Sequence, residues 1–277
     1  MNISRDQLQF YQDNGYICVP GIFPIGQIDR VRAMIYRLFR KFVPDAAELD
    51  GFAEPWNDIA FDRAMCALRA SDPKKFGALY DCAQSSLELL QLVTVPNCLD
   101  VAAAFLGDKA EDLSFSGLML RMDVPEDRRN VLTWHQDHAY YPQNLNDGSA
   151  GLVYWVALQD TPEDMGALHI CAGSQREGLV APETRDKQDY ITTEQRAVPD
   201  SAVASYQQTR GVCKKGDVLL MHMDTFHRSG HNTSDRIRFS VIYRFHRMLA
   251  DDYVPFGLLY QYNPYMMDRA KALAGKR

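Results

Sequence analysis

The chain has 277 residues and a formal net charge of −6, with 46% hydrophobic and 24% charged residues. This composition is ordinary for a globular protein that buries a full core, and the acidic balance argues against a nucleic-acid-binding surface. We find no apolar run of the roughly 18 residues that a membrane span needs, and no apolar leader typical of a signal peptide. The six cysteines form no C-x-x-C pair, which favours reduced thiols and a cytoplasmic protein.

The first 110 residues are expected to be mostly helical. Ser4 and Gln7 have the spacing of a capping box, which predicts a helix that ends at Asn14-Gly15. A short strand should follow over residues 16–19. A second helix is predicted over residues 25–43, because its apolar residues recur at helical spacing. Residues 45–110 are expected to be helical with breaks near three prolines.

From residue 113 onward the pattern changes to strands separated by glycine and proline turns. The predicted strands cover residues 113–121, 131–137, 151–159, 168–171, 218–223 and 238–245. Helices followed by strands indicate an α+β fold that is mainly β. We expect one domain over 1–277, with helical support in 1–110 and the strand core in 111–250. The polar segment 178–210 is long for a loop between two strands, and such loops are often lids.

Two polar clusters lie on the predicted strands. The first contains His135 and Asp137, whose i, i+2 spacing places both side chains on one face of a strand. A histidine from the second cluster, which begins at His227, would complete two histidines and one carboxylate. Such a set binds one face of Fe(II) and leaves the other coordination positions open. His222, on the preceding strand, competes with His227 for this third position.

The sequence resembles the phytanoyl-CoA dioxygenase family of Fe(II)/2-oxoglutarate oxygenases. That family has a His-x-Asp motif followed by a distal block close to His-x-Ser-x-x-Asn-x-Ser-x-x-x-Arg. The distal block matches at His227, Ser229, Asn232, Ser234 and Arg238. The resemblance therefore favours His135, Asp137 and His227 as metal ligands. It implies a double-stranded β-helix, the jelly-roll or cupin-like core, supported by the N-terminal helices.

The same resemblance implies a site for 2-oxoglutarate. Arg238 matches the family arginine that binds the distal carboxylate, and arginine offers a planar, bidentate fork for that group. Ser229 matches a serine that helps to bind the same carboxylate. Trp155 and Met119 lie where the family places other residues of the cosubstrate pocket. Arg236 is expected to face solvent near the turn.

The function implied is hydroxylation of an unactivated C–H bond in a small molecule, with release of succinate and CO₂. The cofactors would be Fe(II), 2-oxoglutarate and O₂, with ascorbate as a possible reductant. His138, Tyr140 and Tyr141 follow the metal motif directly and are candidates for substrate contact, or for aromatic packing. We expect a small-molecule substrate and no nucleic-acid or membrane partner.

Two alternatives remain open at this point. The same iron centre supports desaturation, epoxidation or cyclisation, which the motif does not distinguish from hydroxylation. A non-redox, cupin-like metal-binding protein could have the same barrel. Arg238 and Ser229 argue against the second alternative, because such a protein needs no clamp for 2-oxoglutarate.

Overall fold

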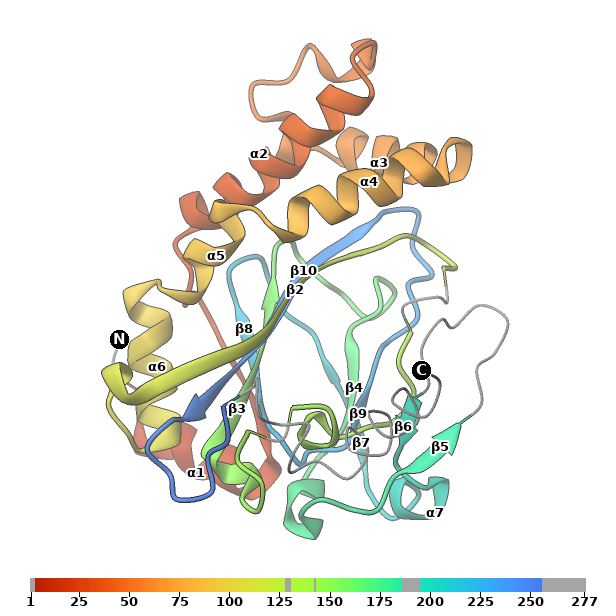
Figure 1. Ribbon diagram of the computed structural model, residues 1–277. Helices are drawn as coiled ribbons and strands as arrows, with labels where there is room; N and C mark the ends of the chain where they lie inside the picture. Colours follow the sequence, from red (N-terminus) through yellow and green to blue (C-terminus); the bar gives the residue numbers. More distant parts are fainter. Residues whose placement is uncertain (1–2, 128–130, 142, 186–194, 256–277) are drawn as a thin grey trace, which may run out of the picture.

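The computed structural model describes residues 3–127, 131–141, 143–185 and 195–255. In this part of the chain, helices gather along one side of a β-sheet, and a second, smaller group of strands lies on its other side (Figure 1). The expected order of helices first and strands second is confirmed. Within the described residues, no single helix is long and apolar enough to span a membrane. The helices Leu87–Val93 and Pro96–Leu106, with a bend of 41° between them, reach that length and composition only when they are taken together.

The first helix begins and ends as its sequence predicts. The Ser4 hydroxyl accepts from the Gln7 N–H at 3.1 Å, and the Gln7 side chain accepts from the Ser4 N–H at 2.9 Å. Gly15 ends the helix with a φ of 75°, a left-handed conformation that glycine adopts without strain. The chain then enters β1. The helices are α1 (Arg5–Asn14), α2 (Ile25–Phe42), α3 (Ile59–Ser71), α4 (Pro73–Gln84), α5 (Leu87–Val93), α6 (Pro96–Leu106) and α7 (Asp200–Val203).

The larger sheet has five antiparallel strands in the order β1-β8-β3-β10-β2. Its strands are β1 (Tyr16–Val19), β2 (Leu113–Asp123), β3 (Gly151–Ala157), β8 (Val218–His222) and β10 (Arg238–Arg247). The central strand β3 pairs Trp155 with Leu219 of β8 and with Ile242 of β10. This order brings strands that are far apart in sequence side by side, as a jelly roll requires.

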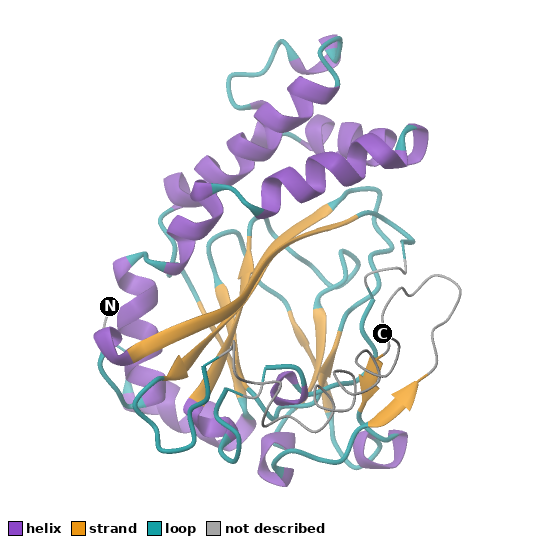
Figure 2. Cartoon of the chain, viewed as in Figure 1, coloured by secondary structure: helices purple, strands orange, loops and turns teal. Residues whose placement is uncertain are grey.

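The smaller sheet has three strands in the order β7-β4-β9 and closes the other side of the barrel (Figure 2). These strands are β7 (Gln208–Gly211), β4 (Leu168–Cys171) and β9 (His227–Arg228). The predicted strand 131–137 is wrong: His135 makes an isolated bridge to His227, and Asp137 begins a short 3₁₀ helix, Asp137–Ala139.

The segment 178–210 contains more regular structure than the sequence predicts. Two strands, β5 (Glu183–Arg185) and β6 (Gln195–Ala197), pair with each other, and α7 follows. Residues 186–194, between these strands, lie outside the described part. The expectation of one long loop is therefore wrong. The backbone N–H and C=O groups of β5 and β6 form hydrogen bonds with each other within the segment.

The five-stranded sheet is buried on both faces. Tyr154 and Val156 of β3 pack with the helices in the main core, whereas Val153 and Trp155 pack toward the small sheet. All seven residues of β3 are buried, so its sequence shows a continuous apolar run rather than alternation. The face toward the small sheet encloses the polar residues described below.

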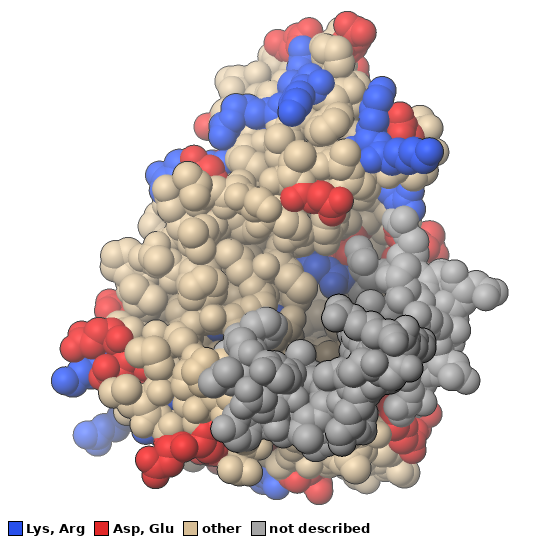
Figure 3. All heavy atoms as spheres, in the orientation of Figure 1, with Lys and Arg blue, Asp and Glu red and all other residues tan. Residues whose placement is uncertain are grey.

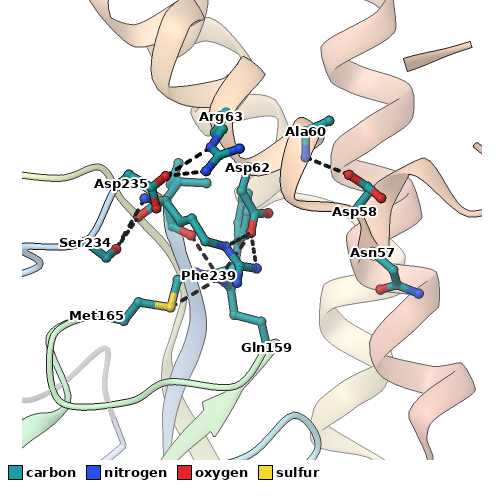
Figure 4. Close-up of polar contacts among 12 residues, drawn as sticks. Asn57, Asp58, Ala60, Asp62, Arg63, Gln159, Met165, Ser234, Asp235 and Phe239 are labelled. Atoms are coloured by element: carbon teal, nitrogen blue, oxygen red, sulfur yellow. Dashed lines mark hydrogen bonds and ion pairs between the residues drawn. The ribbon is translucent and has the colours of Figure 1, made fainter. Parts of the chain in front are cut away.

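A buried ionic network joins the helices to the sheet (Figure 4). Asp62 of α3 is fully buried and pairs through Oδ1 with Arg32 of α2 at 2.8 Å, while its Oδ2 accepts from Arg236 at 2.6 Å. Gln159 accepts from Arg32 at 2.7 Å and donates to the Ile237 carbonyl at 3.0 Å. The expectation that Arg236 faces solvent holds only in part: its side chain is 32% exposed, but its guanidinium is directed to the buried Asp62 carboxylate.

Candidate metal centre

A cavity lies between the two sheets. Figure 3 shows a hollow on this face of the molecule, with basic side-chain atoms inside it. Among the described residues, its lining is Met119, Arg121, Leu132, His135, Asp137, Val153, Trp155, Leu168, Met221, His227, Ser229, Arg238, Ile242 and Arg244. All seven residues that the sequence assigns to metal and cosubstrate are in this set, so the fold brings them together.

The two histidines are fixed by their own backbone. His135 and His227 exchange both backbone hydrogen bonds, at 2.9 and 3.1 Å. The Nδ1 atom of His135 lies 2.7 Å from the Thr133 carbonyl, and Nδ1 of His227 lies 2.9 Å from the Thr225 carbonyl. Because a carbonyl only accepts, each Nδ1 carries the proton and each Nε2 presents a lone pair.

Asp137 completes a three-residue group. Its Oδ1 lies 3.6 Å from Nε2 of His135 and 3.7 Å from Nε2 of His227. This is the one group of metal-ligand side chains found within the described residues, and all three members are buried. The His135–Asp137 convergence is as the sequence predicts, although a 3₁₀ turn rather than a strand produces it.

The protonation states suit a metal. Burial raises the pKa of Asp137, but Arg244, His135 and His227 outweigh it and hold that pKa well below its usual range. Burial, with His135 beside it, lowers the pKa of His227 to about 4. At neutral pH the carboxylate is therefore ionised and the imidazole of His227 is neutral, which is the form that ligates a cation.

The rival histidine lies elsewhere. His222 is on β8, but its side chain faces away from the cavity, and its Nδ1 accepts from the Asp224 N–H at 3.1 Å. Because β8 alternates, Leu219 and Met221 belong to the cavity-side cluster and His222 does not. The geometry favours His227 as the third member.

The expected 2-oxoglutarate residues line the same cavity. Arg238 is buried and pairs with Asp123 through Nη2–Oδ2 at 2.7 Å, and its Nη1 donates to the Gly166 carbonyl. Its Nε is buried and has no hydrogen-bond partner among the described residues. The Ser229 hydroxyl accepts from the Leu132 N–H at 3.1 Å, which leaves its own proton available to a ligand. Trp155 lies beneath the Arg238 guanidinium, 6.0 Å away.

The three residues considered for substrate contact differ in position. His138 does not line the cavity, since its ring nitrogens face Asp224 at 2.8 Å and the Asn144 carbonyl at 2.7 Å. Tyr140 packs edge-on against His135, and its hydroxyl accepts from the Arg196 N–H. Tyr141 lies 4.1 Å from the Arg244 guanidinium. The two tyrosines thus border the centre, and His138 supports the turn that carries Asp137.

Sequence reasoning missed three charged residues of the site: Arg121, Asp123 and Arg244. Asp123, at the end of β2, contacts both Arg121 and Arg238. Arg244 of β10 contacts Asp137. A signal for Arg244 was present, because alternation from Arg238 through residues 240 and 242 places residue 244 on the same face. Asp123 lies just beyond the predicted end of its strand, so nothing in the local pattern pointed to it.

Comparison with solved structures identifies the fold as that of 2-oxoglutarate-dependent oxygenases. The epimerase SnoN, solved in complex with Fe³⁺, alpha-ketoglutarate and nogalamycin RO, matches with a TM-score of 0.59 at 20% identity, over 91% of this chain and 86% of SnoN. EctD from S. alaskensis, solved with 2-oxoglutarate and 5-hydroxyectoine, matches with a TM-score of 0.56 at 17% identity, over 92% of this chain and 82% of EctD. These likenesses confirm the jelly-roll core.

The sequence itself gives the family. The family model of phytanoyl-CoA dioxygenase (PhyH) matches residues 11–240, so the chain belongs to this family. The human peroxisomal phytanoyl-CoA dioxygenase is 21% identical over 242 residues, which cover 85% of this chain. The match spans 66% of that relative's length, slightly under two thirds.

Proposed function

We propose that this protein is an Fe(II)- and 2-oxoglutarate-dependent dioxygenase that hydroxylates an unactivated C–H bond of a small molecule, releasing succinate and CO₂. The observation that carries the proposal is the convergence of two imidazole Nε2 atoms and one carboxylate Oδ1, within 4.8 Å of one another, inside a buried cavity. Two histidines and one carboxylate on one side of a site suit non-haem Fe(II), which keeps the remaining positions open.

The residues present fit such an ion. His135, Asp137 and His227 would hold it, and bound iron would supply the activation of O₂ and the oxidative step. The carbonyls of Thr133 and Thr225 hold both imidazole rings in the ligating tautomer. The chain's own contribution is a buried, preorganised donor set that needs no rearrangement of charge when the cation enters.

Arg238, Ser229, Trp155 and Met119 would form the 2-oxoglutarate site. Asp123 keeps Arg238 in place and compensates part of its charge, because a buried guanidinium without a carboxylate is costly. The unpartnered Nε of Arg238 and the free hydroxyl proton of Ser229 would then donate to the distal carboxylate. O₂ is the third reactant, and ascorbate could keep the iron reduced.

The same iron centre would support more than one outcome. SnoN, with the same fold, is named an epimerase, and desaturation, epoxidation or cyclisation would use the same centre. Arg238 and Ser229 at the cavity wall argue against a non-redox metal-binding protein. We further propose one domain over 1–277 and a cytoplasmic location, which reduced, unpaired cysteines support.

Residues 178–210 are proposed as a lid over the substrate side. Gln195 accepts from the Thr133 N–H at 2.8 Å and donates to the Val131 carbonyl at 3.1 Å. Arg196 donates its N–H to Tyr140. These contacts attach β6 directly to the residues that precede and follow His135, where a lid would act.

The test is anaerobic addition of Fe(II) and 2-oxoglutarate to the purified protein, followed by admission of O₂. The expected results are a weak visible charge-transfer band and slow succinate formation that a substrate from a screen accelerates. His222→Ala is the matched control, and it should keep the band that His227→Ala loses. Absence of the band and of succinate in the wild-type protein would refute the proposed function.

A further inference from the structure

Arg244 is a buried arginine at the metal-facing wall that the family motif does not include. It lies on β10 with 4% relative exposure and lines the cavity together with Asp137. A fully desolvated guanidinium needs a paired carboxylate and filled hydrogen-bond positions, or its burial costs several kcal/mol. The contacts of Arg244 therefore indicate its role in the site.

Its contacts select one oxygen of Asp137. Nε of Arg244 lies 2.7 Å from Oδ2, and Nη2 lies 2.6 Å from the same atom. The other carboxylate oxygen, Oδ1, is the one that faces both Nε2 atoms. The carboxylate is thus divided: Oδ2 is committed to the protein, and Oδ1 is presented to the centre.

The fold builds a socket for this guanidinium. The pairing of β10 with β2 shifts register between Ile242 and Arg244, which places an extra residue on β2. Gly117 lies at this bulge with a φ of 62°, and a Cβ there would meet the Tyr141 ring at 2.6 Å and Nη1 of Arg244 at 2.9 Å. The Gly117 carbonyl accepts from Nη1 at 3.3 Å. Bulges of this kind redirect side chains beside functional sites.

Tyr141 closes the socket from the other side. Its ring lies 4.1 Å from the guanidinium carbon, a cation–π distance. Its backbone N–H donates to the Asp137 carbonyl at 2.9 Å, so the residue that covers Arg244 also fixes the turn that carries Asp137. The Arg244 guanidinium is thus in contact with the Asp137 carboxylate, the Tyr141 ring and the bulge at Gly117.

We infer that Arg244 is a positioning residue for the metal site: it holds Asp137 so that only Oδ1 is available to the ion, as a single-oxygen ligand. This inference rests on the proposed function, because it presumes that the three-residue group binds a metal. Two effects of Arg244 oppose each other. Its charge repels a cation, whereas its hydrogen bonds orient and desolvate the ligand.

The orientation effect is expected to be the larger one. Without Arg244, Oδ2 of Asp137 would be a buried acceptor facing a vacated space, and such a group pays the full cost of desolvation. The carboxylate would rotate or take up a proton, and either change removes the Oδ1 ligand. Loss of partners that orient metal ligands typically weakens metal binding 10- to 100-fold.

The experiment measures Fe(II) affinity, not activity. Wild type, Arg244→Gln and Arg244→Lys are titrated anaerobically with Fe(II) against a chromophoric chelator. Arg244→Gln should bind Fe(II) 10- to 100-fold more weakly, and Arg244→Lys should be intermediate, since it keeps the charge without the fork. Arg247→Gln is the control: Arg247 lies on the same strand but pairs with Asp108 at the surface, so its removal should leave the affinity unchanged.

A second readout separates positioning from general damage. At saturating Fe(II) and 2-oxoglutarate, the visible band of Arg244→Gln should shift relative to wild type, and that of Arg247→Gln should not. If Arg244→Gln does not fold, the Fe(II) affinity and the visible band of Arg244→Lys test the inference in its place. Fe(II) affinity within threefold of wild type, or tighter binding, would overturn the inference. If wild type itself binds no Fe(II), the proposed function fails instead.

Discussion

Two buried aspartates, each paired with arginine, lie on opposite faces of the same five-stranded sheet. Asp62, on the helix side, commits both oxygens: Oδ1 to Arg32 and Oδ2 to Arg236. Asp137, on the cavity side, commits Oδ2 to Arg244 and turns Oδ1 toward two histidine nitrogens. Both are almost fully buried, with 0% and 1% relative exposure.

The difference separates a structural ion pair from a candidate metal site. Burial and an arginine partner are common to both aspartates, so neither property identifies function. The distinguishing feature is an oxygen that is not used by the protein and that converges with other donor atoms. Asp62 should therefore contribute to stability alone, and Asp137 should contribute to cation binding.

The largest expected effect is loss of the metal at the cavity side. His227→Ala removes one of three donors, and bound Fe(II) should fall below detection in metal analysis after anaerobic loading. His222→Ala is the matched comparison, because His222 is on the preceding strand, β8, but does not line the cavity. It should retain one Fe(II) per chain. Metal retained by His227→Ala and lost by His222→Ala would reverse the assignment.

On the helix side, the expected effect is on folding. Asp62→Ala leaves Arg32 buried with no carboxylate, and breaking such a pair costs about 3–5 kcal/mol of the free energy of unfolding. Urea unfolding measures this loss, while Fe(II) affinity of the folded protein should stay at the wild-type value. A weakened Fe(II) affinity with unchanged stability would show that the two regions are not separate.

Asp235→Asn is the control for that prediction. Asp235 pairs with Arg63 close to the network in Figure 4, but their side chains are 64% and 57% exposed. An exposed ion pair is worth about 0–1 kcal/mol. A cost for Asp235→Asn as large as that for Asp62→Ala would remove burial as the explanation.

The candidate metal group was largely predictable from the sequence because its signal is local. His135 and Asp137 are two residues apart, and the offsets from His227 to Ser229 and Arg238 lie within one strand–turn–strand unit. The long-range pairings were not predictable. Asp123 meets Arg238, and Arg32 meets Asp62, only because sheet order and helix packing bring these distant segments together.

In the fold as well, the features with a local sequence signal were the predictable ones. Helices with caps and apolar periodicity were predicted to within a few residues, and so were the strands of the large sheet. Residues 131–137 were assigned to a strand because they lie in the strand-like region that begins at residue 113. This segment instead forms one bridge at His135 and then turns at Asp137. Alternation predicts which face a side chain occupies, but not whether a neighbouring strand is present to pair with it.

A third, smaller effect concerns 2-oxoglutarate. Arg238→Met should leave Fe(II) bound and weaken 2-oxoglutarate binding, because truncating one partner of a buried charge pair costs about 2–5 kcal/mol. This corresponds to about a thirtyfold or larger rise in the 2-oxoglutarate concentration at half-saturation of the visible band. Arg236→Met, two residues earlier but directed to Asp62, should leave that concentration unchanged. Equal effects of the two variants would show that Arg238 acts through the fold.

The smallest predicted effect is a pH dependence from His246, which is buried and whose ring contacts no carboxylate among the residues that the structure describes. His246 lies on the cavity side of β10, with Nε2 2.9 Å from the Ser116 hydroxyl. Burial, followed by the charges of Arg244 and His138, lowers its pKa to about 3. The unfolded chain has the ordinary histidine pKa of about 6.5 and so binds the proton more readily. Stability from this group is thus complete above about pH 6.5 and is lost as the pH falls toward 3.

Between pH 6.5 and 4.5 the loss of the free energy of unfolding from His246 should be about 1–3 kcal/mol. Urea unfolding of His246→Gln should show a flatter pH profile than wild type in this window. An unchanged slope in His246→Gln would mean that this buried imidazole does not set the acid limit of the fold.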